Sequence, residues 1–242
     1  MLSIESLTVA YGGLKALVDV SVEVAEGQFV AIVGPNGAGK TTLFNLLNGF
    51  LPPNAGQVIW ANENLVGMRP NAICRRGIGR TFQVVRPFQR MTVLQNVVVG
   101  AFVAESDDEK ALTLAGEALA RVGMADRAGA LAGGLTHVEL RLMELARALA
   151  SRPQLLLLDE TLAGLGSQEV ERLLTVIDGL AKGGATIVII EHTMHAMVRL
   201  ADRFVVLDHG RMLAQGKPEE VTKHPSVIEA YLGKRWMKHA QH

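Results

Sequence analysis

Apolar and polar residues alternate near the start of the chain, and unbroken apolar runs follow. The alternation over residues 2–9 and 20–24 has a period of two, which predicts half-buried antiparallel strands. Runs without polar interruption predict strands that are buried on both faces of a parallel sheet. Four segments have this character: residues 29–33, 155–158, 185–190 and 204–207.

Helical spacing of apolar residues separates the later runs, over residues 168–181 and 193–201. Strands that alternate with helices predict an α/β core. The middle of the chain has no buried-strand run, and three segments there have helical spacing or composition: residues 93–104, 109–122 and 137–151.

We therefore expect one domain over residues 1–242, with an inserted helical subdomain at 92–152. The α/β core is expected to comprise residues 1–91 and 153–242, and residues 233–242 are expected to be a solvated tail. Lys234, Arg235 and Lys238 give this tail fewer charges than a lipid-binding cluster usually has.

Composition excludes some classes of protein. The 242 residues carry 24 Lys and Arg against 24 Asp and Glu, so the formal charge is zero and a nucleic-acid partner is disfavoured. Cys74 is the only cysteine, which excludes an internal disulfide and fits a reducing compartment. We see no signal-peptide pattern and no apolar stretch near the roughly 20 residues that span a bilayer.

A glycine-rich segment directly follows the first buried run. Gly34-Pro-Asn-Gly-Ala-Gly-Lys-Thr41 fits the G-x-x-x-x-G-K-[ST] pattern, in which backbone N–H groups and a helix N-terminus surround phosphate oxygens. Lys40 is expected to reach the β- and γ-phosphates, and the Thr41 hydroxyl is expected to bind Mg²⁺. The predicted ATP-binding residues here are Gly34, Pro35, Asn36, Gly37, Ala38, Gly39, Lys40, Thr41 and Thr42.

Two acids end the second buried run. Asp159 places a carboxylate at the ligand-binding edge of the predicted sheet, where it can hold Mg²⁺ through water. Glu160 follows and could polarise an attacking water molecule. Together with the glycine-rich loop, the pair predicts an ATPase.

These motifs resemble the ATPase subunits of ATP-binding cassette (ABC) transporters over nearly the whole chain. The resemblance implies an α/β fold: a P-loop NTPase (RecA-like) core with an antiparallel β subdomain and an inserted helical subdomain. It also implies that Tyr11 stacks on adenine and that Gln83 contacts Mg²⁺ and the attacking water and senses the membrane partner. His192 resembles the switch histidine at the γ-phosphate. The predicted catalytic residues are then Lys40, Gln83, Glu160 and His192, with Thr41, Gln83 and Asp159 around Mg²⁺.

Within this family, three segments are similar to the LivG-type ATPase of branched-chain amino acid importers: residues 77–96, 163–165 and 227–233. The resemblance implies membrane-spanning permease subunits, a second ATPase subunit as hetero- or homodimer partner, and an indirect link to a periplasmic solute-binding protein. It places the chain peripherally on the cytoplasmic face of the membrane. Arg86, Pro87 and Phe88 are the candidate permease contacts, and the cargo is left open.

The segment that corresponds to the ABC signature departs from the family pattern. Counting back from Ala146-Arg-Ala-Leu149 places it at Leu135, Thr136, His137, Val138 and Glu139. Val138 replaces a glycine that approaches the opposite subunit's ATP, and we expect its side chain to add bulk there. Residues 131–135 form a competing register about one helical turn earlier. Thr161 and Gly166 stand where Pro and an Asn or Asp are usual.

Two further interpretations stay open. One is an ATP-binding subunit with weak hydrolysis that acts as the regulatory half of a heterodimer, which the altered signature favours. The other is an ABC ATPase unconnected with transport, although such proteins usually carry long insertions or two cassettes in one chain. A GTPase is disfavoured because no Asn-Lys-x-Asp segment is present.

Overall fold

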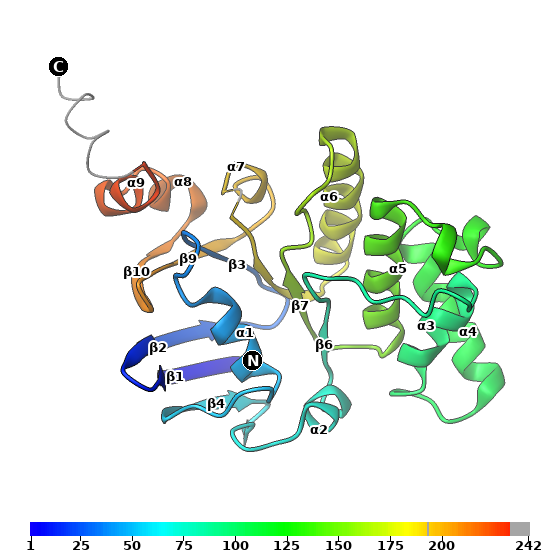
Figure 1. Ribbon diagram of the computed structural model, residues 1–242, viewed down its shortest axis with the longest axis horizontal. Helices are drawn as coiled ribbons and strands as arrows, with labels where there is room; N and C mark the ends of the chain where they lie inside the picture. The colour runs from blue at the N-terminus through cyan, green and yellow to red at the C-terminus, as the bar shows by residue number, and fades with distance from the viewer. Residues whose placement is uncertain (193, 233–242) are drawn as a thin grey trace. The chain divides into compact units, whose positions relative to one another are not determined.

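The structure is a computed structural model that describes residues 1–192 and 194–232 (Figure 1). The chain folds into two compact units. Unit 1 comprises Met1–Pro70 and the chain from Thr186 onward, and unit 2 comprises Asn71–Ala185. The predicted subdomain boundaries at residues 92 and 152 stay a prediction.

The alternating segments at the start of unit 1 form an antiparallel sheet. Inward-facing apolar residues such as Leu2 and Val22 are buried while their neighbours are more exposed, as a period of two requires. The strand order is β2-β1-β4-β5. The strands are β1 (Leu2–Tyr11), β2 (Leu14–Val24), β4 (Ala55–Trp60) and β5 (Glu63–Asn64).

Three of the predicted apolar runs lie side by side in the second sheet of unit 1, in the order β10-β9-β3-β8. Strand β3 pairs in parallel with β8 and β9, and β10 returns antiparallel to β9. All residues of β3 and β8 are buried, as expected for strands without a polar face. These strands are β3 (Phe29–Val33), β8 (Thr186–Ile190), β9 (Arg203–Asp208) and β10 (Arg211–Gly216).

The described helices of unit 1 are short: α1 (Lys40–Leu47), α7 (Met194–Met197), α8 (Pro218–Val221) and α9 (Pro225–Leu232). The prediction of a helix over 193–201 was wrong beyond Met197. There the Met197 carbonyl accepts from both the Leu200 N–H at 3.1 Å and the Ala201 N–H at 2.9 Å, so the chain makes one further turn before it enters β9. Thr193 and the predicted tail at 233–242 lie outside the described residues.

Unit 2 contains the predicted helices and a parallel strand pair. Helices α3, α4 and α5 pack against one another (Figure 1), and β6 pairs with β7. The two 3-10 turns lie at Ala125–Arg127 and Ala132–Gly134. The remaining elements are α2 (Pro70–Arg75), β6 (Ile78–Arg80), α3 (Val93–Ala101), α4 (Asp108–Arg121), α5 (His137–Ala150), β7 (Leu155–Asp159) and α6 (Ser167–Lys182).

Capping boxes built on threonine fix where two of these helices begin. Thr92 and Gln95 form a capping box at α3, and Thr136 and Glu139 form one at α5. Each threonine oxygen accepts from the backbone N–H three residues later, while the longer side chain accepts from the threonine N–H. Among the described residues, no helix is both long and apolar enough to cross a membrane.

Candidate functional site

The glycine-rich segment connects β3 to α1, as the sequence predicts. Gly37 and Gly39 have φ of +82° and +100°, a region that favours glycine. A Cβ on Gly39 would lie 2.6 Å from the Ala16 carbonyl oxygen, so this position also needs a residue without a side chain. The loop therefore turns tightly and presents its backbone at the start of α1.

The start of α1 has the features of an anion site. Its N-cap is Gly39, and no side chain caps it, in contrast to α3 and α5. No acidic residue lies in its first turn. The Lys40 side chain is buried, and its Nζ donates to the carbonyl oxygens of Gly34 at 2.7 Å and Pro35 at 3.0 Å. First-turn amides without a side-chain acceptor, beside an ammonium group, suit phosphate oxygens.

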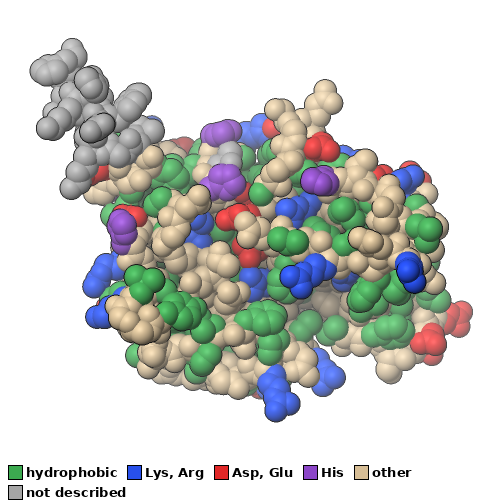
Figure 2. Space-filling view, viewed as in Figure 1, with side chains coloured by type: hydrophobic (Ala, Val, Ile, Leu, Met, Phe, Trp, Pro, Cys, Tyr) green, Lys and Arg blue, Asp and Glu red, His purple; other side chains and the backbone are tan. Residues whose placement is uncertain are grey.

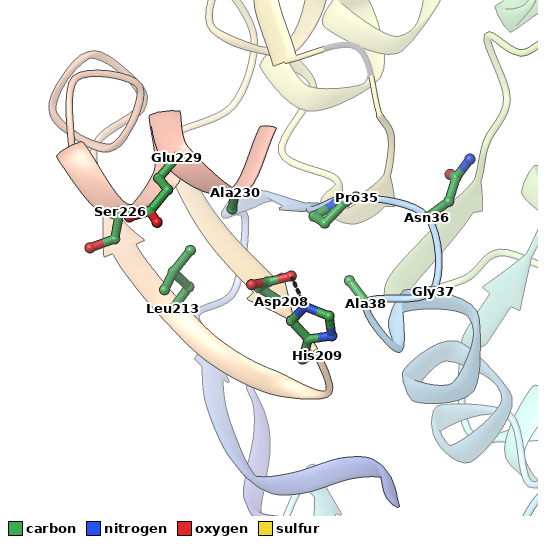
Figure 3. A pocket seen from close by; sticks show the side chains of 10 residues that line it. All are labelled: Pro35, Asn36, Gly37, Ala38, Asp208, His209, Leu213, Ser226, Glu229 and Ala230. Carbon is green, nitrogen blue, oxygen red and sulfur yellow. Dashed lines mark ion pairs between the residues drawn. The ribbon is translucent and has the colours of Figure 1, made fainter. Parts of the chain in front are cut away.

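A cavity of about 560 Å³ is lined by this loop, the β9–β10 turn, β10 and α9 (Figure 3). Its lining includes Asp208, His209 and Glu229 together with the loop backbone. Beside the loop, the Tyr231 hydroxyl on α9 lies close to the Gly34 backbone. Burial raises the pKa of Tyr231 to about 12, and the nearby Gly34 backbone partly opposes this rise.

Tyr11 and His192 also lie in unit 1. Tyr11 ends β1 with half of its surface exposed, which leaves the ring accessible for stacking. His192 lies two residues after the end of β8 and is exposed, with its Nδ1 4.0 Å from the Oε2 of buried Glu191. Their roles toward adenine and the γ-phosphate stay predictions.

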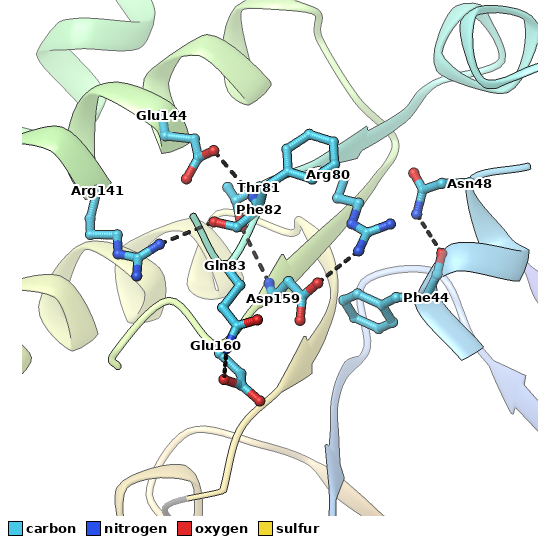
Figure 4. Close-up of polar contacts among 10 residues, drawn as sticks. All are labelled: Phe44, Asn48, Arg80, Thr81, Phe82, Gln83, Arg141, Glu144, Asp159 and Glu160. Atoms are coloured by element: carbon cyan, nitrogen blue, oxygen red, sulfur yellow. Dashed lines mark hydrogen bonds and ion pairs between the residues drawn. The ribbon is translucent and has the colours of Figure 1, made fainter. Parts of the chain in front are cut away.

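In unit 2, Asp159 ends β7 and is held by an arginine that the sequence analysis missed. Arg80 at the end of β6 donates from Nη2 to Asp159 Oδ2 at 2.7 Å (Figure 4), and both side chains are almost fully buried. The Arg80 guanidinium carbon also lies 4.9 Å from the centre of the Phe82 ring. The other carboxylate oxygen of Asp159, Oδ1, is buried and has no hydrogen-bond partner among the described residues.

Gln83 and Glu160 lie together in unit 2. Gln83 Nε2 donates to Glu160 Oε2 at 2.6 Å (Figure 4). Glu160 is half-buried and has φ of +46°, an uncommon conformation for a residue with a side chain. Such conformations persist where the surroundings fix them, and they are frequent at functional sites.

The residues between Arg80 and Gln83 connect the acids to α5. The Thr81 hydroxyl accepts from the Asp159 N–H at 3.3 Å. The Phe82 N–H donates to Glu144 Oε1 at 3.2 Å, and the Phe82 carbonyl accepts from Arg141 Nη1 at 3.0 Å. Glu144 is buried on α5, and burial raises its pKa to about 7 despite the Phe82 amide and nearby arginines.

The segment predicted as the signature lies at the N-terminus of α5. Thr136 is the N-cap and His137 is the first helical residue, whereas residues 132–134 of the competing register form a 3-10 turn. Glu139 Oε2 accepts from both the Thr136 N–H at 2.8 Å and its hydroxyl at 3.0 Å. Glu139 Oε1 lies 3.0 Å from Arg127 Nε. These hydrogen bonds and the nearby arginines lower the pKa of Glu139.

The structure corrects the expectation for Val138. Its side chain is buried, with only 6% of its surface exposed, so it does not project from the helix N-terminus. The charged residue at this helix N-terminus is Glu139, which brings a carboxylate to the first turn of α5.

Thr161 and Gly166 lie in the connection from β7 to α6. Thr161 is buried, and Gly166 precedes α6, where its N–H donates to Glu169 Oε2 at 2.9 Å.

Sequence patterns offered little to find Arg80 and Glu144. Arg80 ends a three-residue strand that contains a glycine, and Glu144 is a polar residue within an otherwise ordinary helical pattern. The position of Arg80 three residues before Gln83 is the one available signal, because it places a cation beside the predicted Mg²⁺-binding residues.

Comparison with known families and structures gives a consistent result. The model of the family described as "ABC transporter" matches residues 17–163, and that described as "Branched-chain amino acid ATP-binding cassette transporter" matches residues 211–236. The high-affinity branched-chain amino acid transport ATP-binding protein LivG of Salmonella typhimurium is 38% identical, covering 96% of this chain and 98% of that protein.

Two solved structures show the same fold. An ABC transporter cassette in its ADP conformation superimposes with a TM-score of 0.88 at 29% identity, covering 97% of this chain and 99% of that one. A cassette described as dimeric, in a post-hydrolysis state with ADP and Pi bound, has a TM-score of 0.80 at 26% identity, covering 90% of this chain and 99% of that one.

Proposed function

This chain belongs to the ABC transporter family, and we propose that it is the ATP-hydrolysing subunit of an importer for branched-chain or related amino acids. The observation that carries the proposal is the near full-length similarity to LivG, combined with an intact phosphate loop and acidic pair. The cargo follows from that similarity alone, since no residue of an ATPase subunit need touch the transported molecule.

The proposed ATP hydrolysis also requires Mg²⁺. Thr41, Gln83 and Asp159 would hold it, and the buried Asp159 Oδ1 without a hydrogen-bond partner among the described residues fits a metal ligand. When bound, the ion would neutralise charge that develops during phosphoryl transfer.

The chain's own residues supply the remaining chemistry. Lys40 would exchange its contacts with the loop carbonyls for the β- and γ-phosphates. Glu160 would accept a proton from the attacking water, and its hydrogen bond with Gln83 orients the carboxylate. His192 would contact the γ-phosphate.

A membrane permease would dock on exposed apolar residues of unit 2. Large apolar side chains that stay exposed are candidates for an interaction surface. Figure 2 shows hydrophobic side chains in several groups on the visible face, with Lys and Arg among them. The exposed apolar residues of the segment after β6 and of α3 with its following turn are Phe82, Val84, Phe88, Val99, Phe102 and Val103. We call them the docking patch, and it includes Phe88 of the contacts predicted from sequence. Arg86 is exposed and Pro87 half-buried beside it.

We propose that the subunit then lies peripherally on the cytoplasmic face, with an indirect link through the permease to a periplasmic solute-binding protein. A second ATPase cassette would complete the assembly, in agreement with the dimeric relative. Glu139 favours one variant of this function. A carboxylate in the signature would weaken the partner's ATP site, so the two sites would hydrolyse unequally and this chain would act partly as a regulatory half.

Substitution in the docking patch tests the importer role. Val84, with 66% of its surface exposed, is expected to contribute apolar contact to the permease. We expect Val84→Asp to abolish co-purification with the permease subunits, because it places a charge in an apolar interface. Leu112→Asp, on exposed α4 surface outside the patch, is the matched control and is expected to retain co-purification. Equal recovery of both variants with the permease would contradict the docking assignment.

A further inference from the structure

We propose that Arg80 is a positioning residue that neutralises Asp159 while no Mg²⁺–nucleotide is bound and thereby weakens the affinity of the site for Mg²⁺. The inference rests on the proposed function, since it concerns the metal that the acidic pair would bind. It adds a residue to which neither the comparisons nor the sequence motifs assign a role.

The first step is the burial of the Arg80–Asp159 ion pair. The side chains are 6% and 3% exposed, and their charged atoms lie 2.7 Å apart. A carboxylate this deeply buried needs a compensating charge, because transfer from water to the interior strongly disfavours an unpaired ion. In the described structure, Arg80 supplies that charge from the neighbouring strand.

The second step is the competition between two cations. Arg80 occupies only Oδ2, while Oδ1 is buried without a hydrogen-bond partner among the described residues. A metal ion approaching Oδ1 therefore meets a carboxylate whose charge is already balanced. It also meets repulsion from the guanidinium, because like charges at short range in a poorly solvated site interact strongly.

The third step is the position of Arg80 in the chain. The segment 80–83 contacts both acids: Arg80 holds the Asp159 side chain, and Gln83 holds Glu160. Phe82 stacks near Arg80 and also belongs to the docking patch. A displacement of this segment would break the hydrogen bonds to both carboxylates together. The Arg80 and Gln83 contacts are therefore coupled through one short segment of the chain.

The test is a Mg²⁺ titration of purified full-length protein with the fluorescent nucleotide mant-ADP. Arg80→Gln is expected to lower the half-saturating Mg²⁺ concentration about tenfold, the order of coupling found between groups in direct contact. Arg80→Lys keeps the charge and should stay near the wild-type midpoint. Arg152→Gln removes an exposed arginine of the same unit and should leave the midpoint unchanged.

The outcomes separate the inference from a structural role. If Arg80 merely supported folding, Arg80→Gln would lower thermal stability without lowering the Mg²⁺ midpoint, and an unchanged or raised midpoint overturns the inference. If Arg80→Gln is unfolded without metal, Mg²⁺–ADP is expected to restore folding at a low Mg²⁺ concentration, and failure to do so also overturns it. If mant-ADP binding to the wild-type protein does not depend on Mg²⁺ concentration, that result would instead contradict the role of the metal in the proposed function.

Discussion

Glu144 shows how one residue can make this fold sensitive to pH near neutrality. Burial on α5 raises its pKa from 4.5 to about 7, and its side chain accepts from the Phe82 N–H next to Gln83. A raised folded-state pKa means that the folded protein binds a proton which the unfolded chain releases. This residue's contribution to stability is therefore most favourable below about pH 4.5 and is lost as the pH rises toward 7.

We predict that Glu144→Gln removes this dependence. Its Oε1 can accept the same hydrogen bond, and its amide carries no charge to desolvate. The free energy of unfolding of the variant relative to wild type should rise by about 2 kcal/mol from pH 5 to pH 8. Denaturant titrations at both pH values measure this difference, with Glu117→Gln on exposed α4 surface as the control. A difference that stays constant with pH would rule out the assigned burial penalty.

At the scale of single elements, the N-terminus of α5 differs from that of α3 by one charge. Both begin with a threonine capping box, but the third helical residue is Gln95 in α3 and Glu139 in α5. The α3 box shows that a neutral amide makes the same pair of contacts. The negative charge of Glu139 is therefore dispensable for capping, and it opposes any phosphate that approaches this helix N-terminus.

We expect Glu139→Gln to raise ATP turnover about two- to fivefold, since charges near helix ends contribute about 0.3–1 kcal/mol. The gain should be largest at low ionic strength. Gln95→Glu makes the reverse change in the α3 box and should leave turnover unchanged. Val138→Gly is expected to lower stability without raising turnover, because the side chain is buried. Steady-state ATPase assays measure these changes in turnover. A gain in turnover from Val138→Gly alone would support the expectation that the Val138 side chain adds bulk at the signature.

The sequence predicts those elements that depend on a local pattern of residues, such as the buried strands and the glycine-rich loop. Runs such as 29–33, bounded by glycines, predict strands buried on both faces, and the glycine-rich loop needs the φ values that Gly37 and Gly39 adopt. Three-residue β6 is too short to leave a periodic signal, and the helix expected over 193–201 ends early where the chain turns into β9. The Arg80–Asp159 contact joins residues 79 apart, so only strand pairing reveals it.

At the scale of the whole molecule, each compact unit carries a different part of the proposed chemistry. Unit 1 holds the phosphate loop and His192, while unit 2 holds the acidic pair, Gln83 and the docking patch. The segment 80–83 contacts both acids and continues into the docking patch. A permease bound there would act on the hydrolytic residues through hydrogen bonds already present in unit 2.

We propose that two cassettes of this kind close around ATP and that hydrolysis assisted by Glu160 reopens them. Light scattering of Glu160→Gln, alone and mixed with the companion ATPase subunit of the same transporter, tests it most directly. We predict a doubling of mass with Mg–ATP but not with Mg–ADP in at least one of these samples, and turnover at least about 10²-fold below wild type. A variant that binds ATP yet stays monomeric in both samples would contradict the account.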